Sequence, residues 1–95
     1  MKLSAIHMEG YDTPALIHNS SIKVYLNGEE LKDVRCFDTD KGSLVQYTRN
    51  DEGNLYYDEN IDDVAQHTIE GSIEIFVDRE CWEEWRGNYP ELKYY

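Results

Sequence analysis

Polar and apolar residues alternate over much of this chain, which is the pattern of half-buried β-strands. Ile22–Leu26 alternates and ends at Asn27-Gly28, a dipeptide that fits a two-residue hairpin turn because both turn positions need positive φ. We therefore expect a hairpin whose second strand lies within Glu29–Phe37. The apolar spacing slips near Lys32-Asp33, which predicts a bulge or an interruption there.

Further strands follow at short intervals, separated by turn-forming residues. Asp38–Gly42 predicts a turn, and Leu44–Arg49 is rich in good strand formers. Asn50–Gly53 predicts a second tight turn, from which the chain returns as a strand through Asn54–Tyr57.

The next part of the chain begins with an acidic stretch, Asp58–Asp63, which predicts an exposed loop. Two more strands are expected after it, Val64–Glu70 and Ser72–Val77. Gly71, between them, indicates either a hairpin or a bulge.

At the C-terminus the period changes from two to that of a helix. Asp78 is a good N-cap, Arg79–Arg86 follows, and Gly87-Asn88 can end the helix. Cys81, Trp82 and Trp85 share one face. Two turns of helix are not stable alone, so this face must pack on the sheet or on a partner. The remaining residues form a short aromatic tail.

The N-terminal segment has the weakest pattern. Lys2–Glu9 predicts another strand. Pro14, following Asp12-Thr13, suits the first turn of a short helix. An irregular arm that packs Leu16 and Ile17 on the sheet fits equally well.

Together these elements predict one domain, residues 1–95, of the α+β class but mainly β. Its architecture is expected to be an antiparallel meander sheet or a small barrel of four to six strands, with one short C-terminal helix.

The net charge limits the classes of partner that the protein is expected to bind. The net charge is −11, and residues 51–95 carry 13 Asp/Glu against 3 Lys/Arg. Such a field repels nucleic acid and anionic membranes and attracts basic surfaces. No run of about 18 apolar residues and no signal peptide is present, so we expect a cytoplasmic protein. The expected state of Cys36 and Cys81 is a pair of reduced thiols, with a disulfide or a shared metal as the alternative.

Candidate chemistry is sparse. The three histidines lack the spacing of a zinc site, and the acidic turn Asp38–Gly42 departs from a calcium loop because Arg49 stands at its twelfth position. No nucleophile motif occurs. We therefore expect no catalytic activity, no cofactor and no metal.

The remaining candidate site is an acidic face with aromatic residues. Its candidate acidic contacts are Asp58, Glu59, Asp62, Asp63, Glu80, Glu83 and Glu84. Its candidate aromatic contacts are Trp82, Trp85 and Tyr89, although packing in the core is the preferred interpretation for the tryptophans. The alternative reading of the acids, plain solvation, stays open.

Part of the chain resembles small β-rich accessory proteins encoded in bacteriophage and prophage genomes. The residues that carry the resemblance are Ile22–Gly28, Val34, Asp38–Gly42 and Gly71–Ile75. The resemblance covers about residues 22–77 and implies a phage product in the bacterial cytoplasm or in the virion. In composition the chain is also similar to acidic anti-restriction and anti-CRISPR proteins.

The function expected on these grounds is a non-enzymatic, acidic domain that binds a basic host protein and blocks its nucleic-acid-binding surface. We expect it to act as a monomer or dimer. Two alternatives stay open: a phage structural or assembly component that makes symmetric contacts, and a sensor domain with a small ligand inside the barrel.

Overall fold

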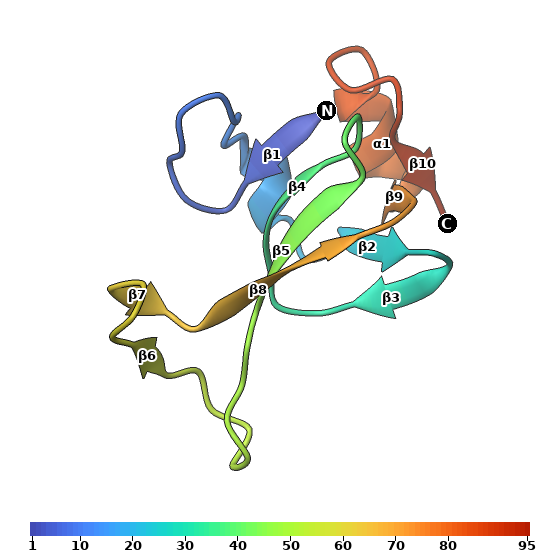
Figure 1. Ribbon diagram of the computed structural model, residues 1–95. Coiled ribbons are helices and arrows are strands. Elements are labelled where there is room, and N and C mark those ends of the chain that lie inside the picture. Colours follow the sequence, from blue (N-terminus) through green and yellow to red (C-terminus); the bar gives the residue numbers. More distant parts are fainter.

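The computed structural model describes residues 1–95 and is built mainly of short strands (Figure 1). The strands are β1 (Lys2–Ser4), β2 (Lys23–Leu26), β3 (Glu29–Leu31), β4 (Val34–Asp38), β5 (Ser43–Tyr47), β6 (Tyr57–Asp58), β7 (Asp63–Val64), β8 (Gln66–Glu70), β9 (Ile73–Val77) and β10 (Lys93–Tyr94). The helices are the 3₁₀ turn η1 (Ala15–His18) and the α-helix α1 (Arg79–Trp85).

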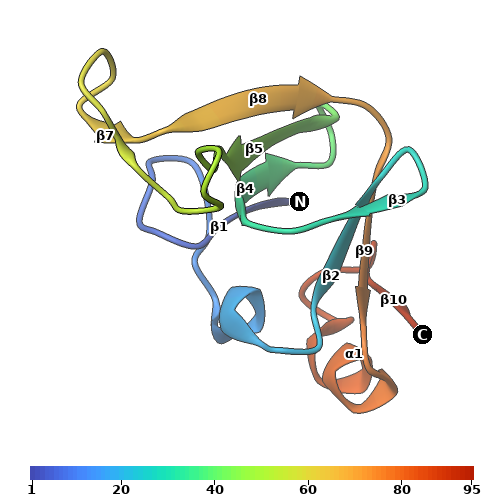
Figure 2. The same cartoon turned by 90° about the horizontal axis from the view of Figure 1, so that it is seen from below.

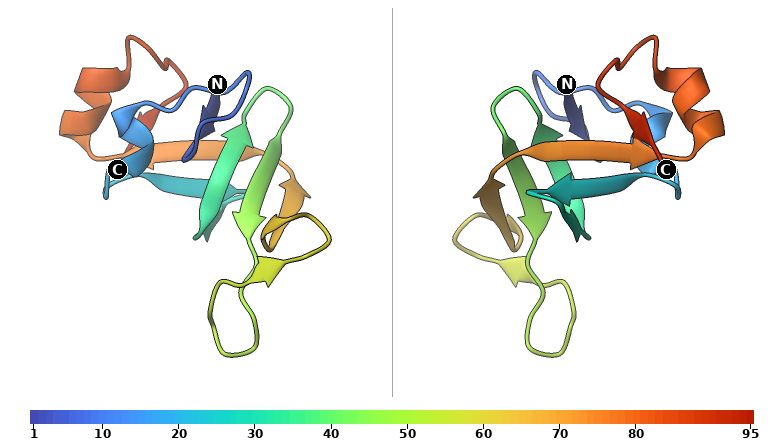
Figure 3. Two further views of the ribbon diagram at one scale, coloured as in Figure 1. Left: turned by 90° about the vertical axis from the view of Figure 1, so that its left-hand side faces the viewer. Right: turned by 90° about the vertical axis from the view of Figure 1, so that its right-hand side faces the viewer.

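These strands form two four-stranded sheets and a small ribbon. The first sheet has the order β1-β4-β5-β8 and the second the order β10-β9-β2-β3, while β6 pairs only with β7. The strands of the two sheets cross steeply (Figure 3). All these pairs are antiparallel except β9 with β10. The expected class, mainly antiparallel β with one short C-terminal helix, is confirmed.

The chain passes between the two sheets at three points, the first of them from β1 through η1 to β2. The hairpin at Asn27-Gly28 is confirmed, since β2 and β3 pair across it and both turn residues have positive φ. The interruption at Lys32-Asp33 is also confirmed: Asp33 has a φ of 57°, and after it the chain enters the first sheet as β4. The return is made after β8, where Gly71 leads into β9. The prediction of a hairpin or bulge at Gly71 is therefore wrong, because its two neighbouring strands lie in different sheets.

Three turns meet where β8 passes into β9. The Gly71 N–H donates to the Gly42 carbonyl at 2.9 Å, and the Ser72 N–H donates to the Asn27 side chain at 2.9 Å. A Cβ on Gly42 would lie 2.5 Å from the Gly71 carbonyl oxygen, at a φ of +67° that disfavours other residues. This corner needs glycine because backbones approach one another closely there.

The hydrophobic core lies between the two sheets. Alternate residues of each sheet point inward, as the period-2 pattern requires. The buried cluster consists of Leu3, Leu16, Val24, Phe37, Leu44, Ile75, Val77, Cys81 and Leu92. Helix α1 contributes Cys81 to it, while η1 contributes Leu16, which is fully buried. The N-terminal helix is thus real, but it is a single 3₁₀ turn after Pro14.

One predicted strand is absent. Asn54–Tyr57 does not return along β5, apart from an isolated bridge between Arg49 and Leu55; β5 pairs instead with β8. In that pairing Ile69 lies opposite Leu44, which is fully buried, whereas residues 50–57 are all exposed and bury no face. Burial of one face decides the register here.

The aromatic tail adds strand β10 to the edge of β9, which the sequence pattern did not predict. No helix of the structure combines the length and the apolar composition needed to cross a bilayer.

Candidate functional site

The most exposed part of the molecule is the segment 50–64, which we call the arm. It extends away from the two sheets and contains the ribbon β6-β7 (Figures 1 and 2). Its 15 residues include six Asp/Glu and no Lys or Arg, so more than half of the net charge of −11 resides in it. Its carboxylates are those of Asp51, Glu52, Asp58, Glu59, Asp62 and Asp63.

The arm also exposes apolar surface. Four of the seven exposed large hydrophobic side chains lie in it: Leu55, Tyr56, Tyr57 and Ile61, which are 41–60% exposed. Single exposed apolar residues are ordinary, but four of them within so short a segment make it a candidate contact surface. Acidic and apolar side chains therefore stand together on one projection.

Local hydrogen bonds order the arm. The Asn50 side chain accepts from the N–H groups of Glu52 and Asn54, at 3.0 and 2.9 Å. The Tyr57 hydroxyl donates to the Asp62 carboxylate, and this bond raises the pKa of Tyr57. The Asp58 carboxylate accepts from the Asn60 N–H at 3.0 Å. These bonds close the two turns of the arm, so its carboxylates are carried on a shaped loop.

Two arginines anchor the arm to the body. Arg35 of β4, whose side chain is 12% exposed, donates to Asp63 at 3.0 Å and also to Gln66 of β8. Arg49, which precedes the arm, donates to the Gly53 carbonyl of the arm at 2.8 Å and makes a two-pronged contact with Asp33 of the body, at 2.7 and 2.9 Å. The Val64 N–H and Arg35 hold the pKa of Asp63 below its usual range, and the bond from Arg49 does the same for Asp33. The arm is thus held at its base by charge-assisted bonds.

The structure separates the predicted acidic contacts into two groups. Asp58, Glu59, Asp62 and Asp63 lie on the arm. The remaining acids belong to α1, which lies at the opposite end of the molecule in every view (Figures 1, 2 and 3). Those acids are Glu80, Glu83 and Glu84, of which Glu83 lies 3.4 Å from Arg79. The seven residues do not form one continuous acidic face.

The predicted aromatic contacts face the body. Trp82, Trp85 and Tyr89 are half-buried and pack against the core. The Trp82 indole N–H donates to the Leu92 carbonyl at 3.0 Å, and its ring lies 4.7 Å from that of Tyr94. This placement favours the core role that the sequence indicated for the tryptophans over a role in partner binding.

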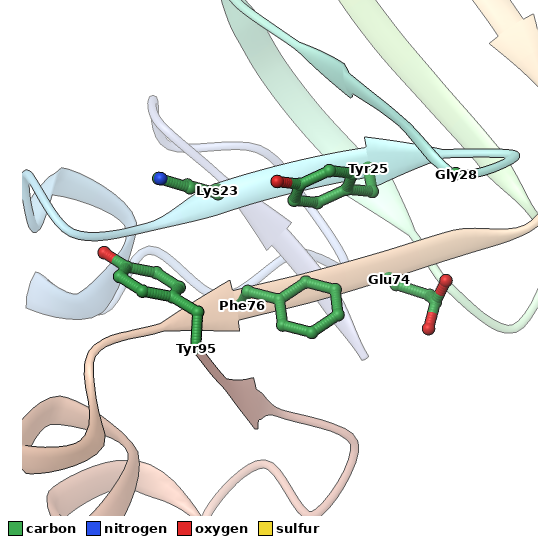
Figure 4. A pocket seen from close by; sticks show the side chains of 6 residues that line it. All are labelled: Lys23, Tyr25, Gly28, Glu74, Phe76 and Tyr95. Atoms are coloured by element: carbon green, nitrogen blue, oxygen red, sulfur yellow. The ribbon is translucent and has the colours of Figure 1, made fainter.

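A separate pocket of about 410 Å³ opens on the outer face of the second sheet (Figure 4). Tyr25 and Phe76 meet edge to face at 5.2 Å, and the Lys23 ammonium lies 4.6 Å from the centre of the Tyr95 ring. Glu74, at the other end, pairs with Lys93. A small apolar group fits such a lining. This pocket lies outside the sheets, whereas a sensor domain was expected to hold its ligand between them.

The two cysteines are free and buried, and no group of three or more His, Cys, Asp or Glu is arranged to hold a metal ion. Burial raises the pKa of both thiols, which disfavours the reactive thiolate. The carboxylate of Asp38 accepts the N–H groups of Asp40 and Lys41, at 3.0 and 3.1 Å. It closes the predicted turn.

Comparison with known proteins gave no likeness: no family model, no curated protein and no solved structure matches this chain.

Sequence reasoning missed the apolar half of the arm. The pattern predicts that Leu55, Tyr56 and Tyr57 return as a strand along β5, where one face of that strand would be buried; Tyr57 instead begins the exposed ribbon strand β6. A usable signal was present: this run lies between two turn-forming acidic stretches and lacks strict alternation.

Proposed function

We propose that this protein binds a basic surface of another protein through its arm and thereby keeps nucleic acid off that surface. The observation that carries the proposal is the composition of the arm, which has six carboxylates, no cation and four exposed apolar side chains. Its host context, a phage product acting on a bacterial cytoplasmic protein, follows from the resemblance of residues 22–77.

Negative charge alone does not distinguish a surface that binds a partner from one whose carboxylates are only solvated. Exposed tyrosine and aliphatic side chains bury apolar area on contact and act as anchors, while surrounding charges select the partner and speed association. In the arm, the apolar anchors are the side chains of Leu55, Tyr56, Tyr57 and Ile61, and the surrounding charges are those of the arm carboxylates. The combination fits a partner that has apolar spots within a field of Lys and Arg.

A basic surface of this kind is typical of proteins that bind DNA or RNA, because their lysines and arginines neutralise phosphates. A loop bearing carboxylates offers such a surface a substitute for the phosphates. The same negative field keeps this chain from binding nucleic acid itself. Its action would therefore be competitive, through occupation of the partner's binding surface.

The test compares two variants with the same change in charge. Asp51, Glu52 and Glu59 are exposed, and their side chains form no hydrogen bond, so replacing all three by lysine alters the arm without disturbing its turns. The matched control replaces Glu80, Glu83 and Glu84 of α1 by lysine. Each variant raises the net charge by six.

We expect the wild type and the helix variant to capture the same basic protein from bacterial lysate at about 0.1 M salt and to release it at about 0.5 M. The arm variant should capture none of it. Excess duplex DNA or RNA should then compete with the wild type for the purified partner. The proposal fails if both variants bind equally, or if the complex is indifferent to salt and to nucleic acid.

A further inference from the structure

The four outer edges of the two sheets differ in how they are protected. Edge strand β1 is covered by the N-terminal segment, since Asp12 exchanges backbone hydrogen bonds with Lys2 and Ser4 at 3.0 and 2.9 Å. Strands β10 and β3 are edges of only two and three residues. Strand β8 is an edge of five residues, which makes it the longest one left open.

Nothing in β8 blocks the addition of another strand. Its register with β5 runs without a bulge from Ser43↔Glu70 to Tyr47↔Gln66. It contains no proline or lysine, the residues that commonly protect an edge. No backbone hydrogen bond joins β8 to any element other than β5. The backbone groups on its outer side are therefore free to pair.

The open edge leads directly to the arm. Strand β7 ends at Val64, the buried Ala65 follows, and β8 begins at Gln66. Arg35 binds both Asp63 of the arm and Gln66 of β8, so it sets the direction of the arm relative to this edge. A polypeptide that paired along β8 would reach the carboxylates of the arm at one end.

We propose that the partner presents an extended, basic segment, which adds to β8 as a further strand and places its lysines or arginines against the arm. Backbone bonds to β8 supply affinity without demanding a particular sequence, and the arm supplies the preference for positive charge. This inference rests on the proposed function and specifies the form of its partner. A second copy of this chain is disfavoured at the edge because each copy carries a charge of −11.

The test uses three synthetic peptides and isotope-labelled protein. The first has about ten residues and alternates lysine with valine and threonine, so that, at roughly 3.3 Å per residue, it spans β8 and reaches the arm. The second is the same peptide with backbone nitrogens methylated on both edges, which keeps the charge but prevents pairing along either edge. The third has glutamate in place of each lysine. NMR titration locates and quantifies the binding of each.

We expect the basic peptide to shift the amide signals of both β8 and the arm. The methylated peptide should bind at least about tenfold more weakly, because two or three backbone hydrogen bonds are lost. The acidic peptide should not bind.

Three results overturn strand addition. The first is equal affinity of the two basic peptides with shifts confined to the arm, which leaves the proposed function standing. The second is no binding of either basic peptide, in which case the arm and helix variants decide the proposed function separately. The third is a concentration-dependent shift of the β8 signals without peptide, which assigns the edge to a second copy.

Discussion

The arm and the helix α1 are built from similar residues and end up in opposite roles. Both combine carboxylates with large apolar side chains in a short stretch. In α1 the helical period gathers Cys81, Trp82 and Trp85 on the side that packs against the core, and the acids remain outside. In the arm the apolar side chains stay exposed beside the acids. Composition therefore does not distinguish the two regions, whereas the location of their apolar side chains does, and it is the reason for proposing the arm as the contact surface.

The arm and α1 also differ in the interactions that attach them to the rest of the protein. Helix α1 is held by apolar packing and by its cap, in which the Asp78 carboxylate accepts the Cys81 N–H at 2.7 Å. The arm is held at its base by ionic contacts through Arg35 and Arg49. Elements held by few apolar contacts open most easily. The arm can therefore vary in sequence and conformation with little cost to the fold.

The largest expected difference between the two regions is in the free energy of unfolding that is lost when an aromatic side chain is removed. Trp82→Ala should lower the free energy of unfolding by about 3 kcal/mol, because it removes a ring packed on the core and leaves the Leu92 carbonyl without its donor. Tyr57→Ala should change it by less than about 0.5 kcal/mol, since the ring is 60% exposed. Urea unfolding measures both. A Tyr57→Ala loss as large as that of Trp82→Ala would contradict the comparison.

A smaller loss of stability is expected when either of two aspartates that accept a nearby backbone N–H is replaced. Asp78→Ala removes the helix cap and should cost about 1 kcal/mol, and Asp78→Ser should restore most of it. Asp58→Ala removes a comparable bond to the Asn60 N–H in the arm and should cost under about 0.5 kcal/mol. Thermal unfolding of the three variants is the measurement. Equal losses for Asp58→Ala and Asp78→Ala would mean that the arm folds cooperatively with the body.

Local chemistry explains what the sequence could predict. The Asn27-Gly28 hairpin and the Asp78 cap depend on a few adjacent residues, whose φ preferences and side-chain acceptors act over one turn. Local chemistry does not predict which strands pair with one another in the sheets. Pairing of β5 with β8 joins Leu44 to Ile69 across 25 positions, and it depends on which strand can bury its face.

The candidate site was predictable only in part. The acidic charge of residues 58–63 is visible in the sequence, and the structure places it on an exposed projection. The grouping of those acids with Glu80, Glu83 and Glu84 was not predictable, because distance along the chain does not indicate that the two segments lie at opposite ends of the fold. The exposure of Tyr56 and Tyr57 depends on the position of the ribbon β6-β7, which extends away from the two sheets and has no core to pack against, and only the three-dimensional arrangement reveals this.

The smallest expected effect is a difference in how the two regions respond to acid. The pKa values of Asp63 and Asp33 are lowered in the folded protein from an ordinary value of 3.8. Each carboxylate therefore stabilises the base of the arm at pH values above 3.8, and this contribution is lost as the pH falls through the lowered pKa. Between about pH 5 and pH 2.5, hydrogen exchange of the arm amides, corrected for intrinsic rates, should accelerate relative to that of the α1 amides, because apolar packing holds α1 in place. Arg35→Met should weaken the protection of the arm at pH 5 and make its dependence on acid shallower. Parallel acceleration of arm and helix would show that the ionic contacts do not set the stability of the arm.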